Sequence, residues 1–489
     1  MNWPKWLRRP RIPDRRADAL DAVVLAAPNV AWRARDLVQG VFVSGATGSG
    51  KTTGPLAAIL ESALRLGCGG MIFSAKRGEA AGHVTLAEAC GRGGDVLLLD
   101  YRARWRVNLC DAVDNPRADP STRAALIAAG IGTLMEVAAR GGAKAGGEND
   151  RFWKQSADRF LQNIVLILLL AGARVTPTAV MQVLQTLPTS PRALATDRFR
   201  AGACFRMLNA AYTRRAGREA EYQAVKDWAL VEVSALAAKT RSVVVATLTG
   251  ALDAASRGVV QKLIATDTTL DLAAALRDDR VIVCDFSYAE WMDTARFVYA
   301  ALKHLVQLEA LRRAVTPATR PFLLVADEYQ NVVSEFDFLY ASMSRSSRCP
   351  LVVCTQGHES LHAVFPGDNG KAKVNTLLGN LVSKFYCLPT PTTAQELCEA
   401  LGRRKRLLTN ASTQAGGYES PLDFLLPGPS RTTGGAAETY ESVLFPAELA
   451  RMRTGGPGNR NVVDALLVQS GRVFDTGYCF TPLAFPQRS

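Results

Sequence analysis

The stretch Gly45-Ala46-Thr47-Gly48-Ser49-Gly50-Lys51-Thr52 decides the fold of this 489-residue chain. It fits the pattern G-x-x-x-x-G-K-[ST], in which glycines let the backbone approach closely and successive N–H groups cradle phosphates. The apolar run 41–43 precedes it and a helical pattern over 52–66 follows, so the positive helix N-terminus faces the same phosphates. We therefore predict a phosphate-binding loop for a nucleotide. The residues expected to bind it are Gly45, Thr47, Gly48, Ser49, Gly50, Lys51, Thr52 and Thr53.

Strand and helix patterns alternate on both sides of this loop. Apolar strand patterns recur at 71–73 and 96–99, and they return at 280–285, 322–327 and 351–355, with helical patterns between them. Strands that alternate with helices form a parallel sheet covered by helices. We predict an α/β fold, namely a P-loop nucleotide-binding domain with a mainly parallel sheet.

Between the two groups of strands, the sequence carries long helical patterns and no strand pattern. Asp150 is expected to cap a helix, and Thr176-Pro177 to begin another. The face of the first helix is expected to include Trp153, Ala157, Phe160, Leu161, Ile164 and Leu168. This block is predicted to be an all-α domain inserted into the nucleotide-binding domain.

The expected domain organisation follows from these patterns. It comprises a basic tail at 1–24, the first part of the nucleotide-binding domain at 25–110, the all-α insertion at 111–246 and the second part at 247–489. A Gly-, Ser-, Thr- and Pro-rich stretch at about 410–440 is expected to be a flexible surface excursion. The glycine-rich basic stretch 140–147 is interpreted as a connector, with contact to nucleic acid as the alternative.

Asp327 and Glu328 end a buried strand pattern and supply the acidic partner of the loop. Together with Thr52, Asp327 is predicted to hold Mg²⁺, while Lys51 lies against the β- and γ-phosphates. Glu328 is placed to orient or deprotonate the attacking water. Gln356 ends the next strand pattern and is predicted to sense the γ-phosphate. Because no [NT]KxD element is present, ATP is favoured over GTP.

Two further patterns leave alternatives open. Arg345 is predicted to act as an arginine finger on a neighbouring subunit, with Arg348 as the alternative. The segment His358-Glu359-Ser360-Leu361-His362 fits HExxH, the helical pattern of zinc peptidases. Only His83 and His304 remain as further histidines, and no acidic ligand follows at a suitable spacing, so zinc binding is disfavoured.

The composition limits the partners and the cellular compartment expected for this chain. The net charge of +13 and the pI near 9.4 favour a polyanionic partner. The ten cysteines form no CxxC pair, which is typical of a reducing cytoplasm. The strongest apolar run, 164–173, is shorter than the roughly 20 residues of a membrane-spanning helix. We therefore expect a cytoplasmic protein with no transmembrane segment of its own.

In this order, the motifs resemble those of the FtsK/HerA-type hexameric DNA motors, and within them the TraG/TraD-like coupling proteins of type IV secretion and conjugation. The segment 73–79 looks like the family's DPKGE strand end, although Ser74 replaces its acidic residue. The similarity continues at 106–109, 152–157, 326–329, 355–356, 377–380 and 401–404.

This resemblance implies a RecA-like ATPase that uses ATP and Mg²⁺ and assembles as a homohexamer. Its implied partners are DNA, single-stranded and bound without sequence preference, a relaxase or relaxosome, type IV secretion ATPases or a separate membrane anchor that recruits it to the inner face of the cell membrane. The basic run 403–406 is interpreted as a DNA contact or as a solvated cluster. Two other readings remain: a receptor for protein effectors without DNA pumping, and a soluble motor in DNA repair, segregation or defence.

Overall fold

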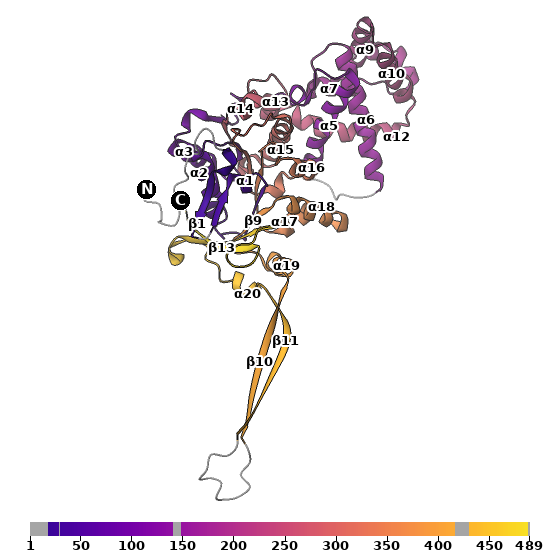
Figure 1. Ribbon diagram of the computed structural model, residues 1–489. Helices are drawn as coiled ribbons and strands as arrows, with labels where there is room; N and C mark the ends of the chain where they lie inside the picture. The colour runs from indigo at the N-terminus through magenta and orange to yellow at the C-terminus, as the bar shows by residue number, and fades with distance from the viewer. Residues whose placement is uncertain (1–17, 29, 140–147, 416–429, 488–489) are drawn as a thin grey trace, which may run out of the picture.

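The computed structural model describes residues 18–28, 30–139, 148–415 and 430–487. Its centre is a nine-stranded sheet with the order β13-β12-β9-β3-β8-β7-β4-β6-β5 (Figure 1). The strands are β3 (Val41–Ser44), β4 (Gly69–Phe73), β5 (Val96–Leu99), β6 (Val281–Cys284), β7 (Phe322–Ala326), β8 (Leu351–Thr355), β9 (Ser383–Tyr386), β12 (Val462–Gln469) and β13 (Phe480–Pro486).

The direction of the strands confirms the predicted α/β class with its mainly parallel sheet. The strands from β9 to β5 all run parallel, whereas β12 and β13 add an antiparallel edge. The strand β3 that leads into the phosphate loop lies between β9 and β8, and β8 lies between β3 and β7. All six strands predicted from the apolar runs are present. The sequence patterns do not predict β9, β12 or β13.

Alternate side chains of the central strands enter two separate hydrophobic cores. In β6, Val281 and Val283 pack into one core, and Ile282 and Cys284 into the other. Both faces of the sheet are therefore buried, as expected for parallel strands. One face is covered by α1 (Ala34–Leu37), α2 (Ala57–Arg65) and α3 (Glu79–Ala89). The other is covered by α15 (Tyr288–Arg312), α16 (Glu335–Met343), α17 (His358–Val364), α18 (Gly367–Asn380) and α19 (Pro391–Leu401).

Helices fill the long connection between β5 and β6, and most of them form a block to one side of the sheet (Figure 1). They are α4 (Leu109–Val113), α5 (Pro120–Ala139), α6 (Glu148–Leu170), α7 (Pro177–Gln185), α8 (Asp197–Arg200), α9 (Ala203–Thr213), α10 (Glu219–Asp227), α11 (Val233–Ala235), α12 (Ala238–Ala255), α13 (Gly258–Ile264) and α14 (Leu272–Arg277). The stretch 140–147 lies outside the described residues.

Details of this block differ from the sequence-based expectations. The helix α6 begins at Glu148, so the backbone of Asp150 lies in its first turn and not before it. Thr176 does cap α7, since its side chain accepts a hydrogen bond from the N–H of Ala179. The helices α4 and α12 run across the boundaries expected after residues 110 and 246. Helical structure thus continues without a break through both positions.

A long antiparallel ladder projects from the body, on the side away from the helical block (Figure 1). It consists of β10 (Arg403–Ala415) and β11 (Ser430–Ser442), paired over their whole length. The excursion expected at 410–440 therefore has regular β structure in its described parts, and residues 416–429 lie outside them. At the base of the ladder, Lys405 and Arg406 form ion pairs with Glu438 and Glu441. The basic run 403–406 is thus partly neutralised.

The segment before the phosphate loop is folded from residue 18 onward, while 1–17 lie outside the described residues. β1 (Val23–Ala27) pairs antiparallel with β2 (Val30–Arg33), so the last part of the expected tail 1–24 belongs to the folded domain. Near the other end of the chain, α20 (Pro446–Leu449) precedes β12. Within the described ranges, no helix is both long enough and apolar enough to cross a membrane.

Candidate nucleotide-binding site

The phosphate loop owes its shape to glycines that no other residue replaces without strain. Gly48 and Gly50 have φ angles of +78° and +80°, in the left-handed region that L-residues rarely adopt. A Cβ on Gly50 would lie 2.4 Å from Cγ2 of Val463 in β12. A Cβ on Gly48 would meet no atom within 4 Å, so the space in front of this residue is open. That opening lies in the middle of the predicted cradle.

The helix after the loop begins with a wide turn. Residues Thr52–Leu56 form a π-helical turn that contains Pro55, and α2 follows it directly. Proline has no N–H to donate and its ring prevents the normal helical hydrogen bond, which accounts for the widening. The N-terminus of this continuous helix points into the loop, so its positive end favours an anion there.

Lys51 and Thr52 link the loop to the neighbouring strands. The Lys51 side chain is buried, with only 6% of its surface exposed. Burial raises the pKa of the Cys387 thiol to about 12, and the charge of Lys51 opposes that shift, which locates the ammonium near the end of β9. The hydroxyl of Thr52 donates a 2.8 Å hydrogen bond to Oδ2 of Asp327. The two residues predicted to share a metal ion are therefore in direct contact.

Glu328 has an unusual backbone conformation for a non-glycine residue. Its φ and ψ angles are +50° and +46°, which costs about 1–2 kcal/mol for an L-residue. Three hydrogen bonds hold the turn: Glu328 N–H donates to Oδ1 of Asp327, and the side chains of Gln330 and Asn331 donate to the carboxylate and the carbonyl of Glu328. Such strain concentrates at functional sites, where the surroundings enforce it.

The sheet order brings the remaining predicted residues to defined places. Gln356 follows the carboxyl end of β8, which separates the strand before Lys51 from the strand before Asp327. The carboxyl ends of these three strands lie at the same edge because the strands are parallel and in register. Gln356 thus stands between the loop and the acidic pair, and its role as a sensor stays a prediction.

Lys76 is a candidate residue whose role the sequence patterns do not reveal. It follows β4, whose last residue Phe73 pairs with Ala326 immediately before Asp327. Burial lowers the pKa of the Lys76 ammonium, but the charges of Asp327, Glu79 and Glu328 outweigh it and leave the pKa above its ordinary value. The signal that would have identified Lys76 is a lysine three residues after the end of β4, the strand next to the one that precedes Asp327.

The two candidate arginine fingers differ in how exposed their side chains are. Both precede β8 and lie at the amino edge of the sheet, opposite to the phosphate loop. Arg348 is buried and donates to the carbonyls of Pro317 and Thr319, and it also pairs with Asp18. Arg345 is exposed. Of the two, Arg345 is therefore the one with an accessible side chain, at the edge of the sheet opposite to the phosphate loop of its own chain.

The HExxH segment has a structural role in α17. The two ring nitrogens of His358 contact Oε2 of Glu396 at 2.8 Å and the hydroxyl of Tyr386 at 3.2 Å. Oε2 of Glu359 accepts a hydrogen bond from Thr393. In the part of the chain that the structure describes, no three histidine, cysteine or acidic side chains gather as a metal site requires. The segment fastens α17 to α19 and β9.

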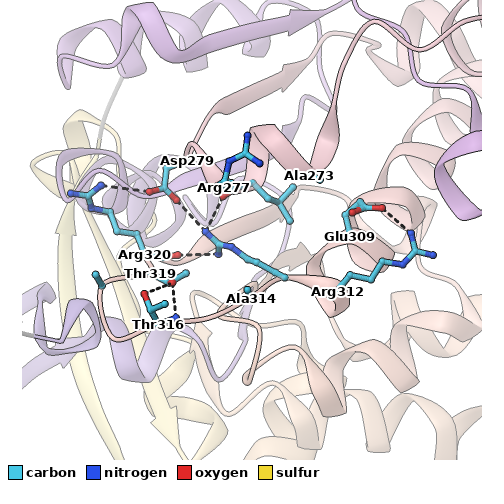
Figure 2. Close-up of a pocket in the computed structure, with 12 residues that line it drawn as sticks. Ala273, Arg277, Asp279, Glu309, Arg312, Ala314, Thr316, Thr319 and Arg320 are labelled. Carbon is cyan, nitrogen blue, oxygen red and sulfur yellow. Dashed lines mark hydrogen bonds and ion pairs between the residues drawn. The ribbon is translucent and has the colours of Figure 1, made fainter. Parts of the chain in front are cut away.

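A separate cavity of about 380 Å³ lies at the amino edge of the sheet (Figure 2). Its arginines are engaged with acidic side chains. Asp279 pairs with Arg313 at 3.3 Å and with Arg320 at 3.5 Å, and Glu309 pairs with Arg312 at 2.9 Å. Because Asp279 precedes β6 and Arg320 precedes β7, this cavity is remote from the phosphate loop and does not belong to the candidate site.

The residues of the loop fit a nucleoside triphosphate with a divalent cation. Thr52 and Asp327 offer adjacent oxygen ligands, and oxygen is the preferred ligand of Mg²⁺. The hydroxyl of Ser49 is buried and has no hydrogen-bond partner among the described residues, next to the open space at Gly48. The fold and this site together define a P-loop nucleotide-binding protein of the RecA-like type.

Comparisons with known proteins identify solved structures with a similar fold. No protein-family model matches the chain, and no curated protein sequence does. The bacterial conjugative coupling protein TrwBdeltaN70, in its trigonal form with sulphate, matches with a TM-score of 0.58 at 14% identity, over 100% of this chain and 95% of that chain. The plasmid coupling protein TrwB in complex with ADP and Mg²⁺ matches with a TM-score of 0.58 at 13% identity, over 94% and 88%.

A third structure, TrwB with the non-hydrolysable ATP analogue ADPNP, matches with a TM-score of 0.57 at 14% identity, over 95% of this chain and 88% of that chain. At such identities the likeness concerns the fold. The chain has the fold of the coupling protein TrwB.

Proposed function

We propose that this chain is an ATP-driven motor of the coupling-protein kind, which brings DNA or a relaxase–DNA complex to a type IV secretion channel. The observation that carries the proposal is the contact of Thr52 with Asp327, beside Glu328, at the carboxyl edge of a TrwB-like sheet. TrwB itself has been crystallised with ADP and Mg²⁺ and with an ATP analogue, which supports ATP and Mg²⁺ as the ligands here.

Each residue of the site has a definite task in ATP hydrolysis. Thr52 and Asp327 would hold Mg²⁺, which would neutralise phosphate charge when bound. The buried ammonium of Lys51 would stabilise the charge that develops on the transferring group. Glu328 orients the attacking water and accepts its proton, with its carboxylate positioned by the amide of Gln330. Gln356, directly after the end of β8, would sense the γ-phosphate from its position between the loop and the acidic pair.

A basic surface on the helical block supports DNA as the partner. Between residues 191 and 218 the sequence carries seven arginines and a single carboxylate, Asp197. The guanidinium of Arg215 lies 3.6 Å from the centroid of the exposed Tyr212 ring. Arginines interleaved with an exposed aromatic ring bind single strands without sequence preference, through phosphate contacts and base stacking. This tip of the block, at α9, lies far from the sheet (Figure 1).

Assembly into a homohexamer completes the proposal. Arg345 is exposed at the amino edge of the sheet, and in such a ring it would reach the site of an adjacent copy. An arginine supplied by a neighbour stabilises the transition state only in the assembled ring, so hydrolysis depends on assembly. The alternative of a receptor for protein effectors predicts hydrolysis that does not respond to DNA.

The experiment that tests the site is ATP hydrolysis by three purified variants and the wild type. Lys51→Ala removes a charge that is complementary to the transition state, and we expect a loss of about 100-fold or more in the rate. Glu328→Gln is expected to slow hydrolysis by a similar factor while ATP stays bound. Lys371→Ala serves as a matched control, since Lys371 is an exposed lysine on α18. Wild-type rates in either site variant would disprove the proposed chemistry.

A further inference from the structure

The positions of the catalytic residues orient the nucleotide along the edge of the sheet. Thr52 contacts Asp327, which directly follows β7, so the γ-phosphate and its cation belong on the side of β8 and β7. A triphosphate is a linear chain, and its α-phosphate and nucleoside must therefore extend the other way. On that side of β3 lie β9 and β12.

The turn at 453–461, which leads into β12, occupies this side. β12 is antiparallel to β9, with Leu466 opposite Tyr386, so β12 begins at the edge where the phosphate loop lies. The turn is packed directly on the loop: a Cβ on Gly50 would lie 3.1 Å from the carbonyl oxygen of Thr454. A Cβ on Gly54, in the helix after the loop, would lie 3.0 Å from Val463.

Four residues with left-handed backbone conformations fix the shape of this turn. Gly455, Gly456, Arg460 and Asn461 all have positive φ angles, at +86°, +76°, +55° and +52°. Gln487, which follows β13, holds the turn at both ends: its side-chain oxygen accepts from Gly456 N–H at 2.6 Å, and its N–H donates to the carbonyl of Asn461 at 2.7 Å. Two adjacent left-handed non-glycine residues are kept only where the surroundings enforce them.

The turn carries two arginines, Arg453 and Arg460, which differ in their contacts. Arg453 is engaged in a two-pronged ion pair with Asp464, at 2.7 and 2.9 Å. Arg460 and Asn461 are exposed, and no carboxylate pairs with Arg460 among the residues that the structure describes. A planar guanidinium stacks on aromatic faces, and a carboxamide carries both a donor and an acceptor. These are suitable groups for a purine nucleoside.

We propose that the 453–461 turn forms the wall of the site that contacts the nucleoside, and that Arg460 binds the adenosine part of ATP. The proposal rests on the proposed function, because it concerns the same nucleotide. The Mg²⁺ and γ-phosphate contacts come from β3, β7 and β8, whereas the nucleoside contact comes from the end of the chain that follows the β10–β11 ladder.

The test compares two ligands that share a triphosphate. The affinities of ATP and of inorganic tripolyphosphate, both with Mg²⁺, are measured by calorimetry on wild type and Arg460→Gly. Glycine accepts the φ angle of +55°, so the variant retains the turn. We expect the affinity for ATP to fall about tenfold or more and the affinity for tripolyphosphate to stay within about twofold. Arg277→Ala, an exposed arginine at the opposite edge of the sheet, controls for the loss of one charge.

Two results would overturn the inference. Unchanged ATP affinity in Arg460→Gly would show that the turn does not contact the nucleoside, and an equal loss for both ligands would show that Arg460 acts on the phosphates. A wild-type chain that binds neither ligand would instead disprove the proposed function, and this inference with it. Thermal unfolding of both variants establishes that they are folded.

Discussion

Gly50 connects the phosphate loop to the last part of the sheet, and its lack of a side chain is essential at that contact. We expect Gly50→Ala to destabilise the fold by about 1–3 kcal/mol, since its Cβ would overlap Val463 and its φ of +80° is strained. Thermal unfolding without nucleotide measures this effect. Gly48→Ala is the matched control, because it has the same strain but open space around its Cβ. Equal destabilisation of both variants would contradict the contact with Val463.

At the level of residues, the phosphate-loop motif and the acidic strand end predict part of the candidate site. The contact of Thr52 with Asp327 agrees with the sequence patterns, because spacing in a loop and position at a strand end are properties of the local sequence. The left-handed backbone of Glu328 and the location of Lys76 near the acids depend on the order of the strands, which local patterns do not encode. The roles of Lys51, Thr52, Asp327, Glu328, Gln356 and Arg345 in hydrolysis all stay predictions.

A buried network ties the turn after the acidic strand to two helices. The carboxylate of Asp337 in α16 accepts hydrogen bonds from Lys303, Gln307 and the hydroxyl of Tyr329, which directly follows Glu328. Lys303 and Asp337 are 1% and 0% exposed. The network therefore couples the backbone beside Glu328 to α15 and α16.

Removal of this carboxylate is predicted to cost the fold a large part of its stability. We expect Asp337→Ala to lower the free energy of unfolding by about 3–5 kcal/mol, because it removes the charge opposite a buried ammonium. Urea denaturation measures the change. Asp368→Ala on α18, an exposed acidic residue, is the control. A change of less than about 1 kcal/mol in Asp337→Ala would contradict the network.

His304 on α15 is predicted to make the stability dependent on pH. Burial, together with the charge of Lys303, lowers its pKa to about 4, against the raising effect of Asp337. The unfolded chain takes up this proton below about pH 6.5, whereas the folded chain does so only near pH 4. The contribution of His304 to the free energy of unfolding is therefore fully present above pH 6.5 and falls as the pH drops toward 4. About 2 kcal/mol of this contribution is lost at pH 5.

Urea midpoints at pH 7.5 and pH 5 check this expectation. In His304→Leu the part of the pH dependence that comes from this group should disappear, while the remaining acid sensitivity persists. An identical pH dependence in wild type and variant would show that His304 does not titrate as its burial implies.

At the level of elements, the strongly apolar strands are predictable and the others are not. β6, β7 and β8 are short apolar runs buried on both faces, and the sequence shows them directly. β9 reads Ser383-Lys384-Phe385-Tyr386, which lacks such a run, and only its place between β3 and β12 makes it a strand. The helix α6 begins two residues before Asp150, and the sequence pattern does not fix this start because an acidic residue is favourable throughout the first turn of a helix.

At the level of the whole molecule, the basic tip of the helical block is predicted to carry much of the affinity for DNA. The triple change Arg200→Glu, Arg206→Glu and Arg218→Glu should weaken binding to single-stranded DNA by more than about tenfold at moderate salt and reduce its salt dependence. Fluorescence anisotropy over a range of salt concentrations measures both. The matched control is Arg277→Glu, Lys371→Glu and Arg451→Glu, with the same change in charge elsewhere on the surface. Equal losses in the two triple variants would contradict a specific role of the tip.

The central claim is that ATP hydrolysis by this chain is coupled to DNA. Its most direct test is the ATPase rate of the purified wild-type protein with and without saturating single-stranded DNA, with the oligomeric state recorded by light scattering in both conditions. We predict that DNA raises the rate several-fold or more, which corresponds to about 1 kcal/mol or more of transition-state stabilisation. An assembly larger than a monomer should accompany this rise. Lys51→Ala should show neither basal nor stimulated hydrolysis. A wild-type rate that is the same with and without DNA would contradict the account and favour a receptor for protein substrates.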